Sequence, residues 1–160
     1  MDENLDTLQR EINLLEDQCP SSALQIFYPL PAHTPVFQRL CQAFVAAAPQ
    51  DRTPIQSLVA GKDGVQNCLL GFAIQCAEEL QSTKDESWLR TGLAAATLAK
   101  SGMDYRDHLM VLAELYVVAE EAGLDPNPAF KAVASLEGFG NYPVVLYARD
   151  GSYRFVPPKP

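Results

Sequence analysis

The chain has 160 residues, a hydrophobic fraction of 48% and a net charge of −8 at pH 7. This length predicts one domain, and the hydrophobic fraction is large enough for a core. The negative charge argues against binding to nucleic acids or anionic membrane surfaces, because both repel acidic proteins. No apolar run reaches the roughly 20 residues of a membrane span. The acidic N-terminus also lacks the basic start of a secretory signal, so we expect a cytoplasmic protein.

The first predicted helix is short and amphipathic. Apolar residues recur at helical spacing within a charged segment, at Leu5, Leu8, Ile12 and Leu15. We expect this helix to pack on the domain, with docking to a partner or to a second copy as the alternative. Prolines punctuate the next segment, which predicts a short helix over 20–27 and then an extended loop that contains His33.

Three helices are predicted in the following part, over 36–48, 55–60 and 64–82. Thr-Pro pairs precede the first two, because proline is well tolerated in a first helical turn. The residues expected to face the core are Phe37, Leu40, Cys41 and Phe44 in the first of these helices, and Leu69, Phe72, Ala73, Cys76 and Leu80 in the third.

The stretch 88–136 is where periodicity, caps and turns agree best. It predicts helices over 88–100, 104–122 and 125–136, with glycines in the connections. The middle one has a narrow polar stripe of Asp107, Glu114 and Glu121, so we expect it to be the central helix of the domain. The short connections predict that adjacent helices pack antiparallel.

Two segments that lie 42 residues apart are similar, since Ala77-Glu78-Glu79 recurs as Ala119-Glu120-Glu121. At the same offset, Leu70 aligns with Leu112, Ala73 with Leu115 and Trp88 with Phe130. A period near 40 residues is typical of HEAT and armadillo arrays. On these residues the chain resembles a short α-α superhelix of the armadillo/HEAT type over 36–136. It is also similar to small bacterial helical proteins of unassigned function in its segments Trp88-Leu89-Arg90, Tyr105-Arg106-Asp107 and Gly123–Pro126.

Residues 137–160 lose the helical periodicity. Two β-branched and aromatic segments flank Asp150-Gly151, which is a strong two-residue hairpin turn. We therefore predict an all-α domain over 1–136, in which antiparallel helical hairpins form an α-α superhelix or a bundle. A C-terminal β-hairpin tail over 137–160 should pack on the same domain, because a lone hairpin is marginally stable in water.

The cysteines predict neither a metal site nor catalysis. Cys19, Cys41, Cys68 and Cys76 contain no C-x-x-C pair and have no histidine at zinc-ligand spacing. We expect them to be buried, reduced thiols. Phosphate-binding glycine loops and nucleophile elbows are also missing from the sequence, so no cofactor is expected.

A set of polar and aromatic residues around the connection near residue 102 is the best candidate binding site: Trp88, Arg90, Tyr105, Arg106, Asp107, His108 and Glu114. Asp104 and His108 have i, i+4 spacing, so they could meet on one helix face and do acid–base work. Arg90 could instead bridge two helices through Asp107 or Glu114.

We interpret the chain as a non-catalytic protein-binding module, adaptor or immunity-like, whose acidic helical surface receives a basic partner. This surface would carry Glu78-Glu79 and Glu120-Glu121. The alternative is a small hydrolase or ligand-binding protein with an interhelical pocket near Arg90, Arg106 and His108. A third reading is a homodimer joined through the helix at 5–15 or through the hairpin edge.

Overall fold

The structure is a computed structural model that describes residues 4–19, 27–99, 105–134, 144–147 and 153–156, with the backbone alone for 105–109 and the last two ranges. Its helices are α1 (Leu5–Glu16), α2 (Thr34–Ala46), η1 (Pro49–Asp51, a 3-10 turn), α3 (Thr53–Ser57), α4 (Asp63–Thr83), α5 (Glu86–Leu98), α6 (Tyr105–Glu121) and α7 (Asn127–Val133). These helices pack against one another, which confirms the predicted all-α class. The helix predicted over 20–27 lies mostly outside the described residues.

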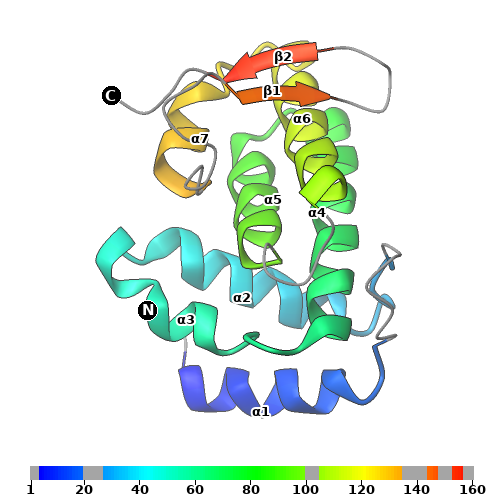
Figure 1. The fold of residues 1–160 in the computed structure, drawn as a ribbon, viewed down its shortest axis with the longest axis vertical. Helices are drawn as coiled ribbons and strands as arrows, with labels where there is room; N and C mark the ends of the chain where they lie inside the picture. Colours follow the sequence, from blue (N-terminus) through cyan, green and yellow to red (C-terminus); the bar gives the residue numbers. More distant parts are fainter. Residues whose placement is uncertain (1–3, 20–26, 100–104, 135–143, 148–152, 157–160) are drawn as a thin grey trace.

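The helices form two crossed groups (Figure 1). The α4 and α5 helices stand side by side and antiparallel, with α6 beside them. The α1 and α2 helices run across one end of this upright group. By their sequence colours, α4 and α6 both run away from that end, so their C-terminal ends point in the same direction.

The observed helix starts follow local chemistry. The Asn4 side chain caps α1 by accepting from the backbone N–H groups of Asp6 at 3.0 Å and Thr7 at 3.2 Å. Pro stands in the first turn of α2 and of α3. Both helices begin at the threonine itself, two residues earlier than predicted, and α3 is only five residues long.

The centre of the domain is α5, and α6, the helix predicted to be central, lies beside it in contact with α4, α5 and both strands. The α5 helix packs against α2, α4, α6 and α7, and it buries every residue from Thr91 to Leu98. Small residues make this possible, because a Cβ added to Gly92 would lie 2.8 Å from Leu115 Cδ2 and 3.0 Å from Cys76 Cβ. The α6 helix is still largely buried over 111–119.

The apolar face of α1 packs on its own domain, as expected. Leu8, Ile12 and Leu15 are buried in the core, and Leu5 is partly buried against it. An ion pair between Arg39 of α2 and Glu11 of α1 holds the two helices together. This face is therefore used within the chain.

Arg52, which lies between η1 and α3, joins two helix ends that are far apart in the sequence. Its Nε donates to the Phe44 carbonyl in the last turn of α2 at 2.9 Å, and its Nη1 donates to the Ala132 carbonyl in the last turn of α7 at 2.9 Å. The guanidinium also lies 4.6 Å from the centroid of the Phe44 ring. One cation thus satisfies carbonyls at two negative helix ends.

Gly71 in α4 marks a close approach of two backbones. A Cβ at this position would lie 2.1 Å from the Phe27 carbonyl oxygen and 2.7 Å from its carbon. The segment that leads into α2 therefore crosses α4 at a point where only glycine fits.

The residues at the 42-residue offset share their environments in most pairs. Buried Leu70 matches buried Leu112, and buried Ala73 matches buried Leu115. The two Ala-Glu-Glu sequences each have a buried alanine followed by exposed glutamates. Trp88 differs from its counterpart, because it is half-buried whereas Phe130 is in the core.

Two strands follow the helices, β1 (Val144–Tyr147) and β2 (Tyr153–Val156). Their backbones pair antiparallel and lie beside α6. The predicted turn at Asp150-Gly151 and the strand side chains lie outside the described residues. A β-hairpin tail that packs on the helical domain therefore stays a prediction.

Candidate functional site

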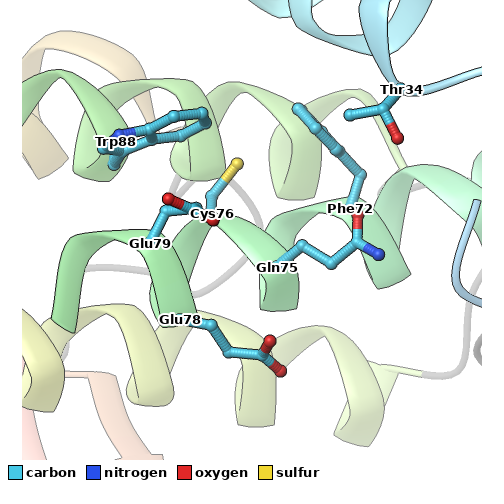
Figure 2. Close-up of a pocket in the computed structure, with 7 residues that line it drawn as sticks. All are labelled: Thr34, Phe72, Gln75, Cys76, Glu78, Glu79 and Trp88. Carbon is cyan, nitrogen blue, oxygen red and sulfur yellow. The ribbon is translucent and has the colours of Figure 1, made fainter. Parts of the chain in front are cut away.

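A pocket of about 250 Å³ opens between α4 and the N-terminal ends of α5 and α2 (Figure 2). Its lining combines aromatic, amide, hydroxyl and carboxylate groups from three helices: Thr34, Phe72, Gln75, Cys76, Glu78, Glu79 and Trp88. The mixture of an apolar floor with a few polar groups is typical of a binding site.

The local sequence brings Trp88 back over α4. Lys84 ends α4 in the left-handed conformation, with φ 57° and ψ 26°, which reverses the chain within a few residues. The Asp85 carboxylate then caps α5 by accepting from the Ser87 N–H at 2.9 Å. Trp88 therefore lies in the first turn of α5, where it returns over the last turns of α4.

The floor of the pocket is rigid and apolar. Phe72, Cys76 and Glu79 follow one stripe of α4, because residues three, four and seven apart share a helix face. Phe72 and Cys76 are buried, and the Phe72 ring stacks on Phe37 of α2 with centroids 6.0 Å apart. Thr34 at the start of α2 completes the wall opposite Trp88.

The electrostatic character of the pocket is negative. Figure 2 shows Glu79 on the side of α4 that faces Trp88, and Glu78 on another side of the helix. The lining residues include two carboxylates and no cationic side chain. Among the described residues, the ion pair that is closest in sequence to the pocket residues joins Arg90 to Glu86 at 3.1 Å. None of the ion pairs in this part of the chain involves Glu79.

The thiol in the pocket floor is held in its protonated form. Burial raises the pKa of the Cys76 thiol above its usual range, and the charge of Glu79 raises it further. A protonated thiol is a weak nucleophile. All four cysteines are buried and free, as predicted.

The predicted site residues are placed as follows. Trp88 lines the pocket, and Arg90 forms an ion pair with Glu86 within α5. A bridge from Arg90 to Asp107 or Glu114 stays a prediction. Glu114 lies half-buried in the middle of α6. Tyr105, Arg106, Asp107 and His108 form the first turn of α6, where the side chains lie outside the described residues. Among the described residues, the structure brings Trp88 together with residues of α4 and α2.

The partners of Trp88 that sequence reasoning missed are Thr34, Phe72, Gln75 and Glu79. Phe72 was identified as a core residue, and Glu79 as part of an acidic helix face. The stripe of Phe72, Cys76 and Glu79 could have been found from helical spacing. The contribution of Thr34 could not, since it depends on how α2 crosses the bundle.

A wider cavity of about 490 Å³ lies beside α3 and the ends of α4 and α5. Neutral residues line it, and its most buried polar group, the Gln66 amide, donates to the Val59 carbonyl at 2.8 Å. It offers neither charge nor aromatic surface to a ligand.

No cluster of His, Cys, Asp and Glu in the described part of the chain has the arrangement of a metal site. No described helix is long and apolar enough to cross a membrane. Comparison of the chain with known protein families, with curated proteins and with solved structures gives no match.

Proposed function

We propose that this protein is a non-catalytic binding module that receives a basic protein partner on an acidic face. This acidic face consists of Glu78 and Glu79 on α4 with Glu120 and Glu121 on α6, and all four glutamates are exposed. The observation that carries the proposal is the position of these carboxylates at the C-terminal ends of two neighbouring helices that run in the same direction.

The helix dipole does not favour this placement. The C-terminal end of a helix carries a partial negative charge, so cations stabilise it and carboxylates do not. Within the described helices, neither α4 nor α6 has a basic residue in its last turn, although Lys84 follows α4 as its C-cap. The two ends therefore add their negative potentials to the four carboxylates. Such a field attracts a cationic surface and increases the association rate of a basic partner.

The experiment compares two variants of equal net charge. In the first, Glu78, Glu79, Glu120 and Glu121 are changed to Gln. In the control, four exposed acidic residues elsewhere are changed to the matching amides: Asp6, Glu16, Asp17 and Asp51. The immobilised proteins are exposed to soluble cell extract at low salt, and captured proteins are identified by mass spectrometry.

We expect the wild type and the control to retain the same basic proteins, and to release them as the salt concentration rises. The variant of the acidic face should lose them. Equal loss in both variants would mean that net charge alone causes the capture, and the proposal would then be wrong.

A further inference from the structure

We infer that the pocket beside Trp88 accepts the guanidinium group of an arginine side chain from the basic partner. This inference rests on the proposed function, and it specifies the residue that the partner inserts. It follows from the aromatic wall, the hydrogen-bond acceptors and the charge of the pocket.

The aromatic wall suits a planar cation. Trp88 is half-buried, so part of its indole ring is packed on the core and part faces the pocket. Tryptophan has the strongest attraction for cations among the aromatic side chains, and arginine uses this contact more often than lysine. A guanidinium can also stack flat on the ring, whereas an ammonium group cannot.

The polar groups of the pocket favour a ligand that has only donors. The Glu79 carboxylate can only accept, and the Gln75 amide and the Thr34 hydroxyl can accept through their oxygens as well as donate. Guanidinium has five N–H donors in a fixed fork and no acceptor, and it can bind a carboxylate through two parallel hydrogen bonds. An anionic ligand would meet Glu79 and Glu78 without a compensating cation from the lining residues.

The position of the pocket links it to the acidic face. Glu78 and Glu79 belong to both, so a partner that lies across the C-terminal ends of α4 and α6 reaches the pocket at its edge. The volume of about 250 Å³ suits one side chain and excludes a folded element. We therefore expect a single arginine to enter while neighbouring basic residues stay on the acidic face.

The test uses the full chain and a pair of peptides, acetyl-Gly-Arg-Gly-amide and the same peptide with citrulline in place of arginine. Citrulline has nearly the same shape but no charge. Trp88 is the only tryptophan in the chain, so its fluorescence reports on the pocket directly. Backbone amide NMR shifts of 34, 72–79 and 88 give a second readout.

We expect the arginine peptide to change the fluorescence in a saturable manner, and to bind at least about tenfold more tightly than the citrulline peptide. Glu79→Gln should weaken its binding about tenfold, whereas Glu16→Gln, which removes the same charge at an exposed position of α1 outside the pocket lining, should change it less than twofold. Both positions are exposed, so both variants should fold.

Equal binding of the two peptides, equal effects of the two substitutions, or shifts outside the pocket would overturn the inference. These outcomes differ from failure of the proposed function. If the acidic face binds basic proteins but the pocket does not bind the arginine peptide, only the pocket assignment is wrong. If the pocket binds the peptide but the four-glutamine variant keeps its partners, only the acidic face is wrong.

Discussion

Replacing Gly71 with alanine tests the close approach between α4 and the segment that leads into α2. Two effects oppose each other. Alanine is favoured over glycine inside a helix by about 1 kcal/mol. The new Cβ, however, would lie 2.1 Å from the Phe27 carbonyl oxygen, about 1 Å closer than an ordinary carbon–oxygen contact. The obstructing atoms belong to backbone, so no side-chain rotation can relieve the contact.

The segment around Phe27 must therefore move away from α4. Phe27 packs partly against the core, and the nearby Pro29 is buried, so the movement exposes apolar surface. Overpacking of this kind costs typically about 1–3 kcal/mol, and here the neighbour cannot adjust locally. We expect the clash to outweigh the helical preference, leaving Gly71→Ala about 1–2 kcal/mol less stable than the wild type.

Urea unfolding followed by circular dichroism measures this difference. Ser82→Ala, at an exposed position of the same helix, is the control, and it should leave stability equal or slightly higher. Gly92→Ala is a second comparison, because its nearest contact is a leucine methyl that can rotate. We expect a smaller loss there. If Gly71→Ala is as stable as the wild type, the close approach does not exist and the reasoning fails.

Three further predictions concern helix ends and the core. Arg52→Ala should lower the free energy of unfolding by about 2 kcal/mol, because the carbonyls of Phe44 and Ala132 lose charge-assisted hydrogen bonds. Chemical denaturation measures this loss. If Arg52→Lys were as stable as the wild type, the double contact of the guanidinium would be contradicted. Lys84→Gly should raise the free energy of unfolding by about 0.5–1 kcal/mol, since the left-handed backbone at this position suits glycine. An unchanged melting temperature would argue against a left-handed backbone at residue 84. The folded state raises the pKa of Cys76 above its ordinary value of 9.0, so stability from this thiol is complete below pH 9 and declines as the pH rises further. Above pH 9 the wild type should lose up to about 1.4 kcal/mol per pH unit more than Cys76→Ala, and parallel pH profiles would refute this.

The inward faces of the helices could be predicted from the sequence, because a buried stripe repeats with the helical period. Phe37, Leu40, Cys41 and Phe44 are all buried, and so are the residues expected to face the core in α4. The central helix could not be predicted in the same way. Apolar residues are abundant in α6, but α5 occupies the centre because Gly92 and its alanines let neighbouring backbones approach.

The candidate site was predictable only in part. The sequence places Trp88 among the predicted binding residues and Glu79 in an acidic pair on a helix face. Their juxtaposition depends on the tight reversal at Lys84, a residue whose type gives little indication of a left-handed backbone. Thr34 enters the pocket from a helix about 40 residues earlier, and spacing within one helix carries no information about such a contact.

The double contact of Arg52 bears on the order in which the chain is assembled. During synthesis, the carbonyl of Phe44 becomes available early, whereas that of Ala132 emerges 80 residues after Arg52 itself. Until α7 has been synthesised, the Nη1 group of Arg52 therefore donates to water instead of to the Ala132 carbonyl. A shortened chain that stops before α7 should keep this arginine hydrated and leave one side of α5 uncovered, which would make it a natural target for quality-control proteases.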